Sequence, residues 1–183
     1  MNYRIEDILP EGLLVQGERD EDWLKGLFQD LKGLEFTFAS PITYSIRLSR
    51  SGSHIMVTGA INVKVELPCS RCLEKYVFSI NSDFTFFLSP ANFKNLPLEM
   101  ELQKEELNME FYEGEVKVID LSRIIQNQII LSIPFNPICK EGCKGLCPHC
   151  GINRNQETCE CSDEGPFDPR LAVLKNFFKP NKT

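Results

Sequence analysis

The chain has no apolar run that approaches the roughly 20 residues needed to cross a membrane. Its first residues, Met-Asn-Tyr-Arg-Ile-Glu-Asp, include acidic residues where a secretory signal needs a basic end and an apolar stretch. The sequence also contains no glycine-rich phosphate loop and no Ser/His/Asp arrangement, and it has only 2 histidines. These absences predict a cytoplasmic protein without membrane contact and without a small-molecule substrate.

Positive charge is also in short supply, because 20 basic residues face 26 acidic ones and the net charge is −6. A protein of this sign attracts nucleic acid poorly through its overall field, so any contact with RNA must be local. Basic residues do stand in or beside the cysteine-rich segments, and they are the candidate RNA-binding set: Arg71, Lys75, Lys140, Lys144 and Arg154. The alternative interpretation is that these cations only offset the negative charge of metal–thiolate sites.

Cysteine is the abundant residue of interest, with 8 copies in two groups. The cysteines stand among Lys, Gly, Pro and Glu rather than in apolar runs, which argues against a packing role. In a reducing compartment such cysteines favour metal binding over disulfides. A turn such as Cys147-Pro-His-Cys150-Gly151 directs two thiolates at one tetrahedral ion, and its glycine is free to take a positive φ. The predicted metal ligands are Cys69, Cys72, Cys139, Cys143, Cys147, Cys150, Cys159 and Cys161.

Eight thiolates suit about two zinc ions with four thiolates each. Iron fits the same ligands, because Cys-Pro-x-Cys-Gly also suits rubredoxin-like iron sites. A site with four thiolates has no open coordination position, so these sites are predicted to be structural rather than catalytic. Several divisions of the ligands are open, and one of them sets Cys69, Cys72, Cys147 and Cys150 against Cys139, Cys143, Cys159 and Cys161.

Two enzyme classes that use paired cysteines do not match the sequence. Pro68-Cys-Ser-Arg-Cys72 fits half of the zinc nucleobase deaminase signature, which also requires an upstream His-x-Glu. The upstream histidine, His54, is followed by Ile55-Met56 instead. A dithiol oxidoreductase needs its Cys-x-x-Cys at the start of a helix, whereas both pairs here stand in predicted turns. We therefore expect a protein that is not an enzyme.

Alternating apolar residues predict three strands at 36–48, 55–67 and 76–88, joined by short turns into an antiparallel meander. Cys69 and Cys72 fall at the tip between the second and third strands. Helical spacing predicts helices at 20–31 and 120–133, which begin with Asp20 and Asp120 and cover the sheet. The predicted fold class is thus α+β, with an antiparallel β-meander covered by helices and a C-terminal cysteine-rich segment held by metal.

The remaining segments complete the predicted organisation. Residues 109–119 suit a further strand with a turn at Gly114, and a last helix begins with Asp168-Pro169. Residues 89–108 read as an irregular excursion with an acidic patch of Glu99, Glu101, Glu105 and Glu106. Two domains are expected: residues 1–135 as the α+β core with the Cys-x-x-Cys tip, and residues 136–183 as the cysteine-rich segment and C-terminal helix packed on it.

Several ordered motifs resemble the YceD-like family, the family of large ribosomal RNA subunit accumulation proteins. They are Leu67-Pro-Cys-Ser-Arg-Cys-Leu-Glu74, Leu131-Ser-Ile-Pro134, the run from Pro137 to Asn153, and Asp168-Pro-Arg-Leu-Ala-Val-Leu174. The resemblance covers about residues 50 to 178. It implies a non-enzymatic role in 23S rRNA accumulation or large-subunit assembly, with rRNA, a large-subunit precursor particle or a ribosomal protein as partner.

Two functions of other classes remain open on the residues alone. The clustered thiols also suit a redox or metal-sensing protein in which the release of zinc is the function. The acidic patch at residues 99–106 also suits an adaptor that binds other proteins. Thiol reactivity toward a mild oxidant, with loss of metal, distinguishes the sensing protein from the ribosomal factor.

Overall fold

A computed structural model of the chain describes residues 1–31, 33, 35–51, 54–91, 109–113 and 118–161. The chain forms two units. The sheet unit consists of Met1–Pro68 and Lys75–Pro137, and the cysteine unit consists of Cys69–Glu74 together with the chain from residue 138 onward. The predicted acidic patch at 99–106, the turn at Gly114 and the helix from Asp168 lie outside the described residues.

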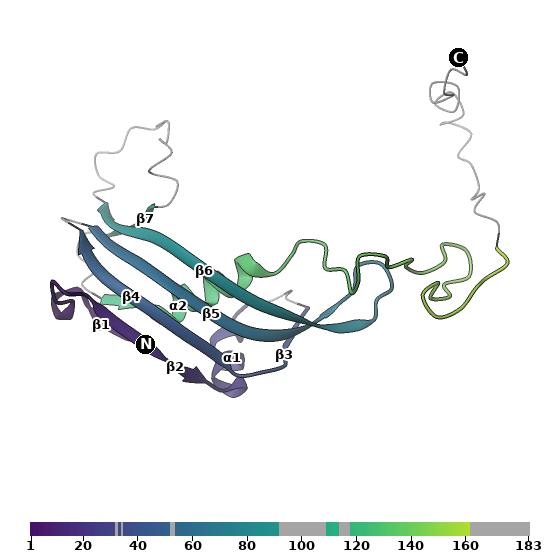
Figure 1. The fold of residues 1–183 in the computed structure, drawn as a ribbon, viewed down its shortest axis with the longest axis horizontal. Coiled ribbons are helices and arrows are strands. Elements are labelled where there is room, and N and C mark those ends of the chain that lie inside the picture. The colour runs from purple at the N-terminus through teal and green to yellow at the C-terminus, as the bar shows by residue number, and fades with distance from the viewer. Residues whose placement is uncertain (32, 34, 52–53, 92–108, 114–117, 162–183) are drawn as a thin grey trace, which may run out of the picture. The chain divides into compact units, whose positions relative to one another are not determined.

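The sheet unit is built on a six-stranded sheet whose central strands form the predicted antiparallel meander (Figure 1). Alternation is the cause, because every second residue along the central strands is apolar and most of these side chains pack into the core on one face. The strand order is β2-β4-β5-β6-β7, and the short β3 also pairs with β5. The strands are β2 (Leu13–Arg19), β3 (Thr37–Phe38), β4 (Ile42–Ser51), β5 (His54–Pro68), β6 (Lys75–Ala91) and β7 (Met109–Glu113).

The sheet differs from the prediction in three places. The segment before the first helix contributes β2, which pairs with β4 along Leu13–Arg19. The first predicted strand is split, with β3 and β4 separated around Pro41. Residues 89–91 continue β6, and β7 pairs with this end in parallel orientation, so the sheet is mixed rather than wholly antiparallel.

Pro41 explains the split between β3 and β4. Proline has no N–H to donate to a strand ladder, so the pairing with β5 is interrupted at this point. At this point the Ser40 hydroxyl oxygen accepts a hydrogen bond of 2.9 Å from the backbone N–H of Lys64, so this N–H group of β5 keeps a partner. On either side of the break, β3 and β4 each pair with β5.

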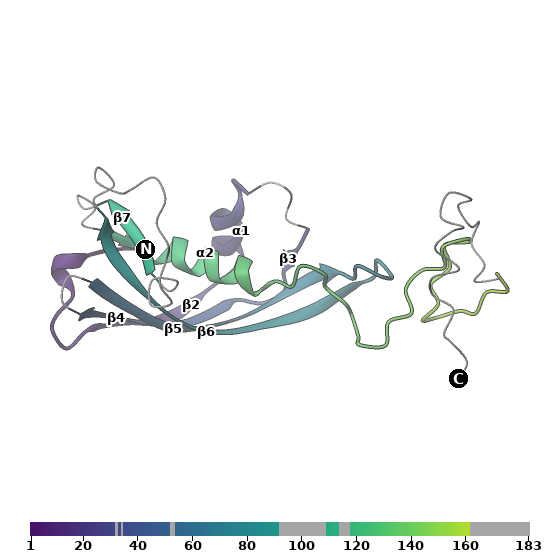
Figure 2. The same cartoon turned by 90° about the horizontal axis from the view of Figure 1, so that it is seen from above.

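Both predicted helices are confirmed, and they lie on the same side of the sheet (Figure 2). Helix α1 (Glu21–Phe28) begins at Asp20, whose carboxylate accepts from the backbone N–H of Trp23 at 2.8 Å. Helix α2 (Leu121–Ser132) begins at Asp120 in the same manner. The core forms between these helices and the sheet, with fully buried Leu24, Ile46, Ile61, Ile125 and Ile129.

A second, two-stranded antiparallel sheet adjoins helix α2. It pairs β1 (Asn2–Arg4) with β8 (Val118–Asp120), and a short 3-10 helix, η1 (Ile5–Asp7), follows β1. Within the described part of the chain, neither helix has the length and hydropathy of a membrane span.

Candidate metal centres

The tip turn, Cys69–Glu74, connects β5 to β6 and folds around the sulfur of its first cysteine. The backbone N–H of Cys69 donates to the carbonyl of Glu74 at 2.9 Å, and the N–H of Leu73 donates to the carbonyl of Cys69 at 2.9 Å. The N–H of Arg71 points at the Cys69 sulfur at 3.4 Å. This pattern turns Cys69 and Cys72 toward the same point, as a pair of metal ligands requires.

The second turn, residues 147–152, repeats the same hydrogen-bond pattern. The N–H of Cys147 donates to the carbonyl of Ile152 at 2.8 Å, and the N–H of Gly151 donates to the carbonyl of Cys147 at 2.9 Å. Gly151 has a φ of +75°, and Leu73 occupies the equivalent position of the tip turn with a φ of +62°. The predicted role of Gly151 is confirmed, and Leu73 takes the same left-handed conformation with a side chain attached.

The first cluster consists of Cys69, Cys72, Cys139 and Cys143, whose four sulfur atoms all lie within 4.8 Å of one another. The sulfurs of Cys69 and Cys143 are 3.8 Å apart, and those of Cys72 and Cys139 are 3.7 Å apart. A tetrahedron with metal–sulfur bonds of about 2.3 Å has edges of about 3.8 Å. The sulfurs therefore already have the spacing that a tetrahedral ion such as zinc requires.

Arg71 joins the tip turn to the segment that carries Cys139 and Cys143. Its guanidinium donates to the carbonyl of Cys143 at 3.0 Å, and its own carbonyl accepts from the N–H of Leu146 at 3.0 Å. Gly145 lies against Arg71 so closely that a Cβ at this glycine would sit 3.0 Å from the Arg71 carbonyl oxygen. The two segments are thus held together by hydrogen bonds as well as by the sulfur atoms.

Asn155 completes the surroundings of the first cluster. Its side-chain amide donates to the sulfur of Cys143 at 3.3 Å, while its carbonyl oxygen accepts from the N–H of Lys144 at 2.9 Å. Sequence reasoning missed this residue, because Asn155 stands in a polar run, Asn-Arg-Asn-Gln, that offers no signal for a contact with sulfur.

The second cluster consists of Cys147, Cys150, Cys159 and Cys161, and its sulfurs also lie within 4.8 Å of one another. All four ligands come from a stretch of 15 residues at the end of the described chain. The guanidinium of Arg154 approaches the Cys147 sulfur at 3.9 Å. Cys147 is buried, whereas Cys150 is exposed and the other two are half-buried.

The division of ligands that set Cys69 and Cys72 beside Cys147 and Cys150 is wrong. The two Cys-x-x-Cys turns look alike in sequence, but each of them is completed by a different pair of cysteines. The contacts of Arg71 bring the tip turn onto the segment around Cys143, and this places Cys139 and Cys143 beside Cys69 and Cys72.

The surroundings of the thiols in the first cluster shift their pKa values in opposite directions. Burial raises the pKa of Cys69, but backbone N–H groups, including those of Cys139 and Arg71, outweigh it and lower the pKa to about 6. Burial and the neighbouring sulfurs raise the pKa of Cys139 to about 12. Four adjacent thiolates repel one another, so full ionisation of the cluster requires a bound cation.

In the second cluster, too, one thiol pKa is lowered and another is raised. The backbone N–H groups of Cys150 and His149 lower the pKa of Cys147 to about 6, against the opposing effect of burial. The sulfur of Cys150, followed by burial, raises the pKa of Cys161 to about 12. A divalent cation is again the species that allows all four ligands to be thiolates.

The basic residues near the clusters fall into two kinds. Arg71 and Arg154 contact the cluster residues themselves, as described above. Lys140 and Lys144 are exposed in the cysteine unit, and Lys75, at the start of β6 in the sheet unit, pairs with Glu66 at 2.9 Å. The two arginines thus have a structural role in the clusters, while the lysine side chains face solvent.

The family model described as "Large ribosomal RNA subunit accumulation protein YceD" matches residues 57–178 of the chain. The chain belongs to the YceD family. The matched range includes all eight cysteines, so both clusters lie within the part that the YceD family shares. Strands β1 to β4 and helix α1 precede it, and β5 begins at His54, just before its start.

Three relatives illustrate the similarity. A protein of Arabidopsis thaliana named "Large ribosomal RNA subunit accumulation protein YCED homolog 1, chloroplastic" is 28% identical over 71% of this chain and 46% of its own length. Its namesake in Zea mays is 25% identical over 76% of this chain and 54% of its own length. An uncharacterized protein of Mycobacterium tuberculosis (strain H37Rv) is 28% identical over 74% of this chain and 61% of its own length. The chain therefore spans about half of the length of these relatives, and no solved structure matches it.

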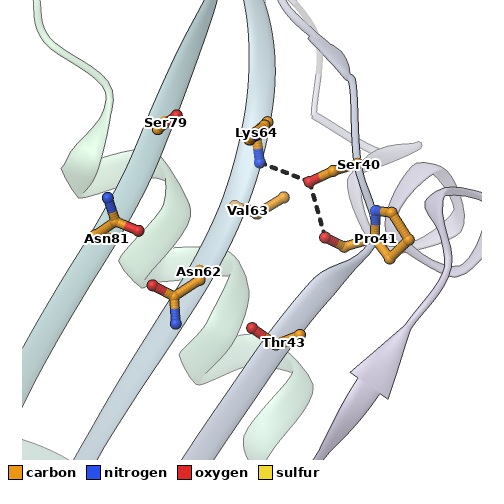
Figure 3. A pocket seen from close by; sticks show the side chains of 8 residues that line it. All are labelled: Ser40, Pro41, Thr43, Asn62, Val63, Lys64, Ser79 and Asn81. Carbon is orange, nitrogen blue, oxygen red and sulfur yellow. Dashed lines mark hydrogen bonds between the residues drawn. The ribbon is translucent and has the colours of Figure 1, made fainter.

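The YceD chain also has a shallow groove on the face of the sheet opposite helix α2 (Figure 3). Its volume is about 270 Å³. Asn62 stands directly across from Thr43 on β4 and from Asn81 on β6, and Lys64 is the charged residue of the lining. One cation among hydroxyl and amide groups offers little electrostatic attraction for RNA. The groove is lined by Ser40, Pro41, Thr43, Asn62, Val63, Lys64, Ser79 and Asn81.

Proposed function

We propose that this YceD-family chain is a non-enzymatic zinc-binding factor that supports accumulation of large-subunit ribosomal RNA and contacts a large-subunit precursor with its cysteine unit. The family membership supports the proposed role in rRNA accumulation, because the family description and the names of the two plant relatives refer to large ribosomal RNA accumulation. The clusters support the non-enzymatic role, since zinc held by four thiolates has no position left for a substrate.

The balance of charges in the cysteine unit limits how this unit can bind RNA. Residues 69–74 and 138–161 hold four cations and four carboxylates, and each zinc bound by four thiolates would add about −2. Attraction to phosphate must therefore depend on the placement of exposed Lys140 and Lys144 rather than on net charge. The same balance favours a second candidate, in which the cysteine unit docks on a basic ribosomal protein.

The test is cosedimentation of purified protein with large-subunit precursor particles over a range of salt concentrations. The double variant Lys140→Glu, Lys144→Glu should lose binding, and the salt dependence should flatten by about 0.7 to 0.9 in logarithmic slope per lost phosphate contact. Lys25→Glu, Lys64→Glu makes the same change in charge on the sheet unit and should bind as the parent does. Unchanged binding by the first pair would mean that RNA contact through these lysines is wrong and that the ribosomal-protein candidate leads.

A further inference from the structure

The two clusters differ in how much protein surrounds each ligand. In the first cluster, Cys69 is 0% exposed, Cys72 and Cys143 are each 3% exposed, and Cys139 is half-buried. In the second, only Cys147 is buried to this degree, at 2% exposure, and Cys150 is open to solvent. A chelator or an oxidant therefore has direct access to a ligand of the second cluster and not to the three buried ligands of the first.

Among the described residues, more N–H donors point at the sulfurs of the first cluster than at those of the second, where the Cys147 sulfur receives the Arg154 guanidinium at 3.9 Å and the backbone N–H groups of Cys150 and His149. In the first cluster, the sulfur of Cys69 accepts from the N–H groups of Arg71 and Cys139 at 3.4 Å each. The amide of Asn155 adds a contact to Cys143. Hydrogen bonds of this kind hold metal ligands in position, and losing them typically costs about 10- to 100-fold in metal affinity.

The chain path adds a third difference. The first cluster joins cysteines that are 67 and 74 residues apart, and the clasp of Arg71 on Cys143 keeps the two segments together. The second cluster is local, because its ligands lie within 15 residues. Opening the second cluster therefore requires only a short segment to move, while opening the first requires two distant segments to separate.

From these three differences we infer that the two sites are unequal: the first cluster is a permanent structural zinc site, and the second is an exchangeable site that yields its metal first to a competing ligand or to peroxide. This inference rests on the zinc binding proposed above. It assigns to the second cluster the sensing role that the clustered thiols suggest, without extending that role to the first.

The oxidative route balances with hydrogen peroxide as the oxidant. The exposed thiolate of Cys150 attacks one peroxide oxygen, the O–O bond breaks, and hydroxide leaves a sulfenic acid behind. A second thiolate of the cluster, within 4.8 Å, attacks that sulfur, and a disulfide forms as a second hydroxide leaves. Two protons convert the hydroxides to water. The zinc ion, having lost two of its four ligands, dissociates.

The experiment measures zinc release from the full-length protein with a chromogenic chelator, after total zinc has been determined. Two phases are expected, one zinc each, with rates that differ by about tenfold or more. Alkylation followed by peptide mass spectrometry should label the second cluster during the fast phase. Limited hydrogen peroxide should likewise produce a disulfide within Cys147, Cys150, Cys159 and Cys161 while one zinc stays bound.

Two matched variants assign the phases. Cys150→Ser should retain one zinc that leaves in the slow phase, and Cys139→Ser should lose the slow phase. A single phase, first labelling of Cys69 or Cys72, or a fast phase that persists in Cys150→Ser would overturn the inference while the zinc binding stands. Protein that contains no zinc would overturn the proposed metal binding, and this inference with it.

Discussion

At the scale of single residues, the position after the second cysteine of each turn requires a left-handed backbone conformation. Gly151 and Leu73 both have positive φ, a conformation that costs a residue with a Cβ about 1 to 2 kcal/mol. Glycine adopts it freely at residue 151. At residue 73 the hydrogen bond from the Leu73 N–H to the Cys69 carbonyl holds the conformation in spite of the leucine side chain.

We expect Gly151→Ala to weaken the second cluster. The strain of about 1 kcal/mol corresponds to about a fivefold loss in zinc affinity, measured by competition with a chelator. Gly142→Ala is the control, because Gly142 lacks a positive φ and a Cβ there would meet no atom within 4 Å. If both variants bind zinc equally, the positive φ at residue 151 does not limit the site.

At the scale of elements, Asp120 joins helix α2 to the start of the chain. Its carboxylate caps the helix through the N–H of Ser122 at 2.9 Å and also lies 3.2 Å from the ammonium group of Met1. Burial raises the pKa of Asp120, but these two donors outweigh it, so the pKa lies below its usual value of 3.8. A lowered carboxyl pKa stabilises the folded state above pH 4 or so, and the stabilisation is lost as the pH falls through the folded pKa.

Asp120→Asn should therefore destabilise the sheet unit by about 0.5 kcal/mol at neutral pH, the size of a partly exposed ion pair. Asparagine still caps a helix well, so the loss reports the charge. In urea unfolding, the difference from the parent should vanish toward pH 3. Asp20→Asn, at the start of α1, is the comparison, because among the described residues the Asp20 carboxylate caps a helix without a direct ion pair. A deficit at pH 3 as large as at pH 7 would contradict the assignment to charge.

At the scale of the whole molecule, the chain enters the cysteine unit twice, through the tip turn and again after Pro137. The first cluster is where these two passages meet. Because the four cysteines are brought together only in the folded state, the free energy of the proposed zinc binding would become free energy of folding for both passages together. Removing one cysteine of the first cluster should thus destabilise segments that are far away in the sequence.

Cys72→Ser should increase hydrogen exchange in residues 138–146 as well as in the tip turn, because both lose the shared metal. Cys159→Ser, in the second cluster, should increase exchange mainly in residues 147–161. Hydrogen exchange with mass spectrometry measures both. Protection lost in Cys72→Ser only within Cys69–Glu74 would show that the two passages are stabilised independently.

The sequence by itself was sufficient to predict the features that depend on near neighbours. Alternation in 55–67 placed the apolar side chains of β5 on one face, and Asp20 and Asp120 marked the starts of both helices. The eight cysteines could also be named as candidate metal ligands, because their close spacing is a local property of the sequence.

Only the tertiary structure decided which cysteines belong together. Two similar turns compete for the same partners in sequence, and the choice is made by contacts between residues about 70 apart, those of Arg71 with Cys143 and Leu146. The parallel pairing of β7 with β6 and the place of β2 beside β4 were decided in the same way. Strand pairing and ligand sharing depend on which segments meet in the folded chain, and local periodicity carries no information about that meeting.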